Sequence, residues 1–141
     1  MTKEHYYYLS VQEKLDWYAK LIKLRDHDKL SYPKIGKMFE ISEKRVRDCI
    51  AEARKVAVWN KTSSLWRAIC NKVPNEPSSY AIRMFGILQS SGVYTINDLL
   101  KTPLEDIKGF YGIGVKYYKT LSSIRAEEIE KLDTRITKES R

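Results

Sequence analysis

The sequence predicts an all-α protein built from two small domains. Apolar residues recur at helical spacing along most of the chain, and no stretch alternates apolar with polar residues for the length of a strand. The 141 residues are enough for one ordinary domain or two small ones. Residues 73–79, VPNEPSS, break the helical pattern with two prolines and polar turn formers. We therefore expect domains over residues 1–62 and 79–141, joined by a connecting helix and linker over residues 63–78.

The first domain is expected to hold three helices, each starting at a serine. Serine caps a helix by accepting a hydrogen bond from a backbone amide of the first turn, and the candidates are Ser10, Ser31 and Ser42. Glu13 follows Ser10 at the spacing of a capping box. The first helix should end near residues 25–29, and Pro33 suits the first turn of the second. The third should run from about residue 43 to residue 58.

The rest of the chain is expected to be helical as well. A connecting helix should cover residues 64–72, capped by Ser63 or Ser64. Beyond the linker, apolar spacing predicts four further helices, over residues 80–91, 95–101, 103–110 and 115–132. The polar tail TRITKESR is expected to fray, as chain ends commonly do.

Residues 35–50, IGKMFEISEKRVRDCI, have the spacing of two crossing helices joined by a tight turn. The apolar positions at which such helices bury each other are Ile35, Phe39, Ile41, Val46 and Ile50, and Gly36 lies at the closest approach. The pattern resembles the bacterial helix-turn-helix family, whose core reads Ile-Ala-x-x-Leu-Gly-Val-Ser-x-x-x-Val. Glu40 stands where that family has glycine. This position often takes a left-handed backbone conformation, which costs a non-glycine residue about 1 kcal/mol.

The helix-turn-helix resemblance implies a set of DNA contacts. In such motifs, exposed residues in the first two turns of the second helix enter a major groove. The candidates are Ser42, Glu43, Lys44, Arg45 and Arg47, with Asp48 beside them. The arginine side chains have the planar fork that grips guanine edges or phosphates, and Glu43 has the acceptor for cytosine N4.

Residues 109–114, GFYGIG, raise the question of a nucleotide site. A dinucleotide fingerprint needs a preceding strand, and a phosphate-binding loop needs a following Gly-Lys-Ser/Thr; neither is present. The surrounding apolar spacing instead favours a helix–hairpin–helix, in which Gly112 and Gly114 allow a tight turn. Backbone amides at the start of the following helix suit a phosphate. Lys116 and Lys119 add positive charge beside them.

Residues 79–121 resemble the C-terminal domain of the bacterial RNA polymerase alpha subunit. The matching residues include Arg83, Leu88, Gly92, Thr95, Asp98, Leu99 and Gly114. The resemblance implies that Arg83 enters an AT-rich minor groove, whose narrow shape concentrates negative potential, and that Gly114 and Lys116 take phosphates. Three other contact positions differ, because Gly86 and Gly112 replace asparagines and Tyr117 replaces a serine. The resemblance thus leaves two readings open, a DNA contact or a fold kept for a protein partner.

The charge is consistent with a polyanion partner. The chain carries 26 basic and 18 acidic residues, a net charge of +8. Residues 1–62 contribute +5 and residues 63–141 contribute +3, so the excess is not confined to a tail. Each phosphate that a basic residue neutralises releases condensed counterions, which favours binding.

The remaining composition argues against several other classes. No apolar run reaches the length that spans a bilayer, about 20 residues, and the N-terminus lacks a secretory signal, so we expect a cytoplasmic protein. Cys49 and Cys70 fall at core positions, and the cysteines and histidines have no metal-ligand spacing. Carboxylates are scattered along helices rather than clustered for metal-assisted catalysis. We therefore expect no metal, no cofactor and no enzymatic activity.

Two functions are consistent with the motifs and the charge of this sequence. The leading prediction is a double-stranded DNA-binding regulator of bacterial, phage or mobile-element origin, acting in transcription or in replication or partition. The alternative is an adaptor whose second domain docks on RNA polymerase or another DNA-bound protein, anchored by Tyr111, Tyr117 and Tyr118. Self-association is left open, and the helix over residues 115–132 is the one candidate for a helical dimer seam.

Overall fold

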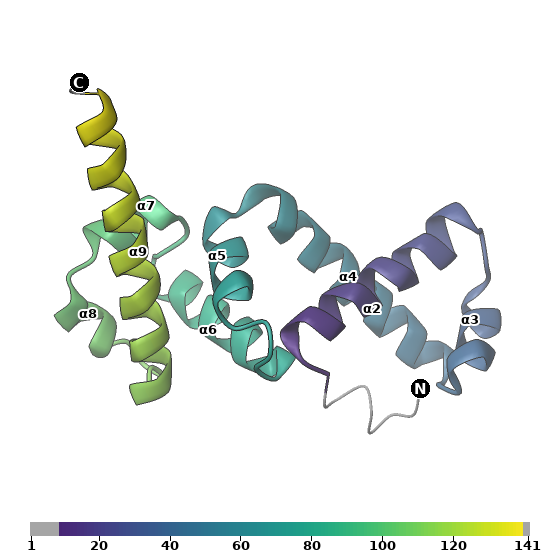
Figure 1. Cartoon of the computed structure of the whole chain (residues 1–141). Coiled ribbons are helices and arrows are strands. Elements are labelled where there is room, and N and C mark those ends of the chain that lie inside the picture. The colour runs from purple at the N-terminus through teal and green to yellow at the C-terminus, as the bar shows by residue number, and fades with distance from the viewer. Residues whose placement is uncertain (1–8, 140–141) are drawn as a thin grey trace. The chain divides into compact units, whose positions relative to one another are not determined.

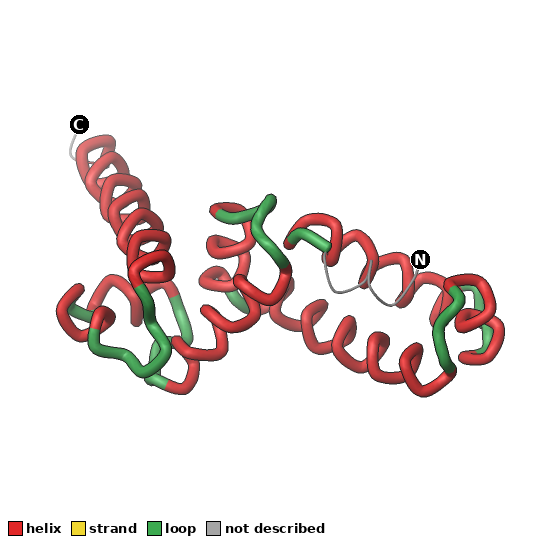
Figure 2. The backbone as a smooth tube through the Cα atoms, turned by 90° about the horizontal axis from the view of Figure 1, so that it is seen from below, coloured by secondary structure: helices red, strands yellow, loops and turns green. Residues whose placement is uncertain are grey.

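The chain is all-α, as predicted (Figure 1). The computed structural model describes residues 9–139, and side chains as far as residue 136. Its helices are α2 (Val11–Ile22), the π-helical η1 (Lys23–His27), α3 (Tyr32–Phe39), α4 (Glu43–Thr62), α5 (Ser64–Lys72), α6 (Ser78–Ser90), α7 (Ile96–Lys101), α8 (Leu104–Lys108) and α9 (Val115–Glu139). Short loops join them (Figure 2). Within residues 9–139 the β-structure is limited to an isolated bridge between Ser10 and Pro77.

The described chain divides into two compact units that do not follow a single cut in the sequence. The first unit takes residues up to 62 together with residues 73–80, and the second takes residues 63–72 and those from 81 onward. The expected connector is therefore shared between them, with α5 in the second unit. Residues 73–78 join the first unit through backbone hydrogen bonds, among them Val11 N to Glu76 O at 2.8 Å and Ser78 N to Leu9 O at 3.0 Å.

Serine caps start the helices of the first unit, as the sequence predicts. Ser10 and Glu13 form the expected capping box, each side chain accepting the other residue's backbone amide at 3.2 Å. The hydroxyl of Ser31 accepts from the backbone of α3, and that of Ser42 from the backbone of α4. For α5 the cap is Ser63, whose hydroxyl accepts from Trp66 N at 3.0 Å.

Several helix ends differ from the expectation. Helix α4 continues four residues past the expected end at residue 58, to Thr62, because no glycine or proline interrupts it. The last helix runs to Glu139 instead of residue 132, so the polar tail is helical rather than frayed as far as that residue. Helix α9 also contains no glycine or proline that would end it earlier. Helix α8 (Leu104–Lys108) is shorter than the expected 103–110, with Gly109 as its C-cap.

The first unit packs α2, α3 and α4 around one core. Trp17 of α2 meets Phe39 of α3 edge to face, with ring centroids 4.6 Å apart. Gly36 is required where α3 approaches the following turn, because a Cβ there would lie 2.7 Å from the Ile41 carbonyl oxygen. Cys49 lies in the same core as a buried free thiol.

The second unit has a separate core. Trp66 of α5 meets Phe85 of α6 with ring centroids 5.3 Å apart. Leu99 of α7, Ile107 of α8 and Leu121 of α9 are fully buried. Cys70 is also buried, and this burial raises the pKa of its thiol to about 12, so it stays protonated and unreactive. Among the described residues, no helix is long and apolar enough to cross a membrane.

Candidate functional site

The turn between α3 and α4 has the backbone conformation expected from the sequence. Glu40 adopts φ 57° and ψ 42°, in the left-handed region. The chain then returns through a hydrogen bond from Ile41 N to Gly36 O at 3.0 Å. Ser42 caps α4 by accepting a hydrogen bond from Arg45 N at 3.1 Å. Together these bonds fix the direction in which the first turns of α4 leave the turn.

The five residues predicted from this segment gather at the start of α4, but they do not all face solvent. Ser42, Glu43, Lys44 and Arg47 are exposed. Arg45 is half-buried and lines a hollow of about 290 Å³ together with Glu40, Ile41 and Ser42. The expectation that Arg45 is exposed is therefore wrong. Its position on the helix turns it back toward the α3–α4 turn, whereas Lys44 and Arg47 point outward.

Arg47 belongs to a cluster that the sequence did not reveal. Its guanidinium forms an ion pair with Glu43 at 2.7 Å and lies 5.4 Å from the centre of the Tyr32 ring. Arg25 stacks on the same ring at 4.3 Å and donates to the carbonyl of Leu30 at 2.9 Å. Two cations thus share one aromatic ring, a favourable cation–π arrangement. No motif links residues so far apart in the sequence, so only the fold brings them together.

A second ion pair ties the middle of α4 to η1. Arg54 donates two hydrogen bonds to Asp26, at 2.7 and 2.8 Å, in the bidentate geometry that a guanidinium favours. The hydrogen bond from Arg54 is the main reason why the pKa of Asp26 lies below its ordinary value. This pair holds the segment that carries Arg25 against α4.

In the second unit, a surface hollow of about 650 Å³ lies between α6 and the hairpin before α9. Its lining residues are Arg83, Gly86, Ile87, Ser90, Ser91, Tyr111, Gly112 and Tyr117. Arg83 and Gly86 come from α6, whereas Gly112 and Tyr117 come from the hairpin and the start of α9. All four positions correspond to contact positions in the alpha-subunit resemblance. The fold brings them to one surface although about 30 residues separate them in the sequence.

The two glycines of the hairpin have different roles. Gly112 has φ 92°, so the backbone favours glycine there, and a Cβ would also lie 3.0 Å from Cδ1 of Ile87, which would have to shift by a few tenths of an ångström. Gly114 does not adopt a positive φ, and a Cβ there would meet nothing within 4 Å. The expectation that both glycines serve the turn is thus wrong for Gly114. Its carbonyl accepts the hydrogen bond from Tyr118 N at 3.0 Å, so α9 begins there with open space beside it.

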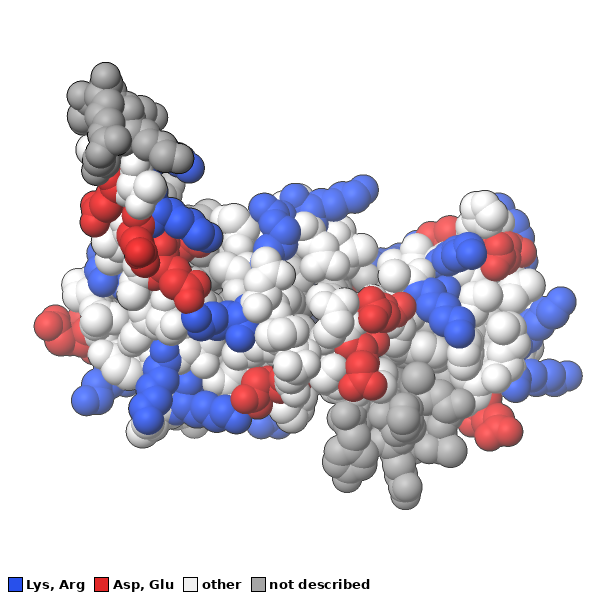
Figure 3. Space-filling model, in the orientation of Figure 1, with Lys and Arg blue, Asp and Glu red and all other residues white. Residues whose placement is uncertain are grey.

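Arg83 and two tyrosines line this hollow, and further lysines lie near it at the start of α9. Arg83, Lys116 and Lys119 are exposed, and Figure 3 shows lysine and arginine side chains gathered where α9 begins. Tyr111 at the tip of the hairpin is 98% exposed. Tyr117, by contrast, is half-buried. The site combines positive charge at its edge with an apolar floor.

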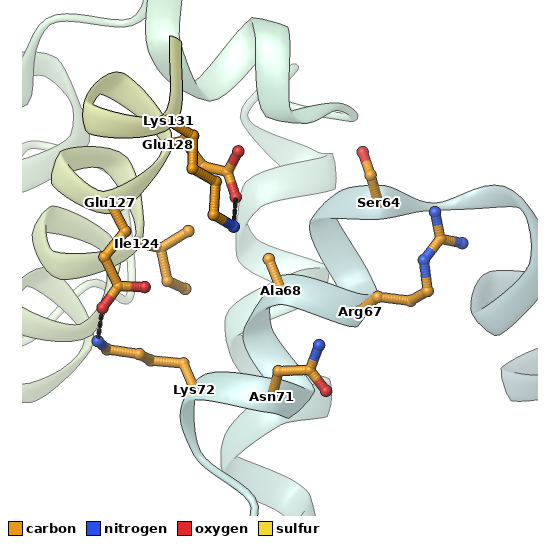
Figure 4. A pocket seen from close by; sticks show the side chains of 9 residues that line it. All are labelled: Ser64, Arg67, Ala68, Asn71, Lys72, Ile124, Glu127, Glu128 and Lys131. Carbon is orange, nitrogen blue, oxygen red and sulfur yellow. Dashed lines mark hydrogen bonds and ion pairs between the residues drawn. The ribbon is translucent and has the colours of Figure 1, made fainter. Parts of the chain in front are cut away.

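A second hollow of this unit, of about 500 Å³, lies between α5 and α9 (Figure 4). Lys72 of α5 pairs with Glu127 of α9, and Lys131 pairs with Glu128 at 3.2 Å along α9. Each lysine of this hollow already contacts a carboxylate, and Arg67 of α5 also lines it. Unlike the hollow beside Arg83, this one therefore contains carboxylates, which oppose the binding of an anion.

These features describe an all-α protein with excess positive charge in both halves of its sequence. Among the described residues, no group of three or more histidine, cysteine, aspartate or glutamate side chains is placed to hold a metal ion. Comparison with known proteins gives no matching family model, no matching curated protein and no matching solved structure.

Proposed function

We propose that this protein is a non-enzymatic, double-stranded DNA-binding regulator of transcription. In this proposal α3 and α4 act as a helix-turn-helix in a major groove. Helices α8 and α9 act as a helix–hairpin–helix at an adjacent minor groove and backbone. Joining two modest binding units raises the affinity of the whole chain, because binding of the first increases the local concentration of the second.

The observation that carries the proposal is the shared surface of Arg83, Gly86, Gly112 and Tyr117. These are positions that the alpha-subunit resemblance associates with DNA contact, and Arg83 is the one of the four that keeps the residue expected for it. Lys116 and Lys119 lie exposed near the start of α9, where the helix dipole also favours an anion. A phosphate backbone laid along this edge meets positive charge from both sources.

DNA binding by the first unit is supported by the geometry of the α3–α4 turn and by the positive charge of the chain. Glu40 takes the left-handed conformation at the position where the helix-turn-helix family has glycine. The exposed start of α4 presents Lys44 and Arg47 side by side with the cap residue Ser42. A net charge of +8, spread over both halves of the chain, suits a partner that carries phosphates.

The proposal is tested by salt-dependent titration of random and AT-rich duplexes, with one charge removed from each unit. Arg47→Ala probes the major-groove surface and Arg83→Ala the minor-groove surface. The control for the first is Lys61→Ala, an exposed cation near the far end of the same helix, about 28 Å from Ser42 at 1.5 Å per residue. Lys101→Ala at the end of α7 is the control for the second.

We expect wild-type binding to fall steeply with salt, and each probe variant to weaken it. Loss of one phosphate contact should reduce the slope of log K against log salt by about 0.9. Arg83→Ala should weaken binding to AT-rich duplex more than to random duplex, whereas the two controls should change little. A wild-type protein that binds no duplex at low salt would refute the proposal.

One observation favours the second candidate function, a protein-interaction adaptor. Tyr111 is almost fully exposed beside an apolar hollow, and exposed aromatic residues are common anchors of protein interfaces. Tyr111→Ser separates the two functions, because an adaptor loses its partner while DNA binding through Arg83 persists. Pull-down of purified RNA polymerase with wild type, Tyr111→Ser and Arg83→Ala makes the comparison.

A further inference from the structure

The C-terminal half of α9 extends beyond α7 and α8 of its own unit (Figure 1). Leu121 on this helix is fully buried in the core of the unit. Leu132 lies eleven residues later, which is close to three full helical turns, so the two side chains share one face. Leu132 is 41% exposed, and Ile129 and Ile136 beside it are 37% and 59% exposed. The buried face of α9 therefore continues as an apolar stripe of Ile129, Leu132 and Ile136.

The charge around this stripe disfavours DNA as its partner. Residues 126–136 carry four carboxylates and two cations, although the chain as a whole is strongly basic. Figure 3 shows acidic side chains gathered along this part of α9. The excess of carboxylates disfavours phosphates here, whereas a second apolar helix face with mixed charge would complement the stripe.

We propose that this stripe binds the same stripe of a second copy of the chain, with the two α9 helices antiparallel. Ile129, Leu132 and Ile136 have the spacing of consecutive core positions in a two-stranded coiled coil. Glu128 and Arg135 then flank the seam on one side, one heptad apart, and Asp133 flanks it on the other.

The flanking charges select the orientation. In a parallel pair, Glu128 faces Asp133 of the second copy, and like charges repel. In an antiparallel pair, Glu128 faces Arg135 of the second copy. The twofold symmetry then produces two equivalent copies of this ion pair. Glu128 also contacts Lys131 of its own helix at 3.2 Å, and a carboxylate has acceptor sites for both cations.

The size of the stripe sets the strength of the contact. Standard stable interfaces bury about 800 Å² on each partner, more than two helical turns provide. The dimer is therefore expected at micromolar concentration rather than at nanomolar concentration. A twofold pair presents two copies of each DNA-binding surface, which suits a palindromic site. The dimer itself does not depend on DNA binding, so its test uses no DNA.

Sedimentation equilibrium of the full chain over a range of concentrations tests the proposal. Wild type should shift from monomer to dimer as concentration rises. Leu132→Lys keeps a good helix former but places a charge in the seam, and should remain monomeric with unchanged helical content. Val58→Lys, at an exposed apolar position of α4, is the matched control and should dimerise like wild type. A wild-type chain that stays monomeric, or a Leu132→Lys chain that dimerises normally, overturns the proposal.

Charge exchange tests the orientation. Glu128→Arg and Arg135→Glu should each weaken dimerisation by about fivefold to tenfold, because two symmetric pairs turn repulsive. The double variant should recover wild-type dimerisation. In a parallel pair, Glu128→Arg would instead face Asp133 and strengthen the dimer, and that result would overturn the antiparallel arrangement.

Discussion

The carboxylate of Glu43 holds the guanidinium of Arg47 at 2.7 Å, one helical turn apart on the exposed start of α4. Both residues are exposed, so the pair is weak in water and exchanges readily for another partner. It nevertheless places a negative charge on the surface proposed to face DNA. Glu43 thus competes with phosphates for the arginine.

Replacing Glu43 by glutamine should tighten binding to random-sequence duplex. The change removes a charge that repels phosphates and frees Arg47 to contact them. We expect an increase in affinity of about threefold to tenfold at low salt, since charge-assisted contacts of this kind contribute about 1 kcal/mol. Fluorescence anisotropy measures it, with Glu105→Gln on α8 as the control for net charge. Weaker binding would assign Glu43 itself to a DNA contact.

Glu40→Gly should stabilise the first unit. Glu40 has φ 57°, a region that costs a residue with a Cβ about 1 kcal/mol or more. Glycine avoids this cost but gains freedom in the unfolded chain, so a net increase of about 0.5–1 kcal/mol in the free energy of unfolding is expected. Urea denaturation measures it. Lys37→Gly, within α3, should lower the free energy of unfolding by about 1 kcal/mol. A destabilised Glu40→Gly protein would contradict the left-handed turn.

Gly86→Asn should tighten binding to AT-rich duplex. Nothing lies within 4 Å of a Cβ at this position, so asparagine fits without repacking. It restores the amide that the alpha-subunit resemblance places at this contact, and a new hydrogen bond to DNA should raise the affinity several-fold. Gly86→Ala is the matched control, because it also improves helix propensity but adds no amide. An equal increase in DNA affinity for both variants would show that the gain comes from a more stable helix and not from a new contact between the asparagine and DNA.

The pH dependence of stability should change when Lys14 is replaced by methionine. Lys14 is 7% exposed, and its burial lowers its pKa from 10.5 to about 8. Below about pH 8 the lysine is charged in both states, and the full cost of burying the charge destabilises the fold. Between pH 8 and 10.5 the folded state loses its proton first, so this cost disappears as pH rises.

Lys14→Met should therefore be more stable than wild type near neutral pH, by roughly 3 kcal/mol at most. The difference should shrink toward zero as pH rises to 10.5. Cys70 also contributes to the pH dependence of the free energy of unfolding, in the opposite direction, because its pKa is raised. Both proteins contain Cys70, so its contribution cancels when they are compared at the same pH. A difference that does not vary with pH would show that Lys14 keeps its charge in the folded protein.

Local signals account for what could be predicted of the fold. Helix starts could be predicted from Ser10 with Glu13 and from Ser42 ahead of α4, because a cap involves only residues within one helical turn. Helix ends were harder to predict. No breaker follows residue 58 or residue 132, and a helix without a stop signal ends where packing or the next cap decides.

The candidate site was predictable only in part. Lys44 and Arg47 follow from helix phase and are exposed, whereas Arg45 is half-buried because the turn folds back on it. Arg25 and Tyr32 reach Arg47 through packing between separate helices. No spacing in a single sequence reports such contacts.

The sequence by itself determined the helical class, the caps, the left-handed turn at Glu40 and the basic charge of both halves, because these depend on neighbouring residues or on composition. The tertiary structure decided which distant residues share a surface. It brought Arg83 to the hairpin at Gly112, divided the connector between two units and left Leu132 exposed at the end of a buried face. Burial depends on how whole helices pack, and that is a property of the assembled chain rather than of any one segment.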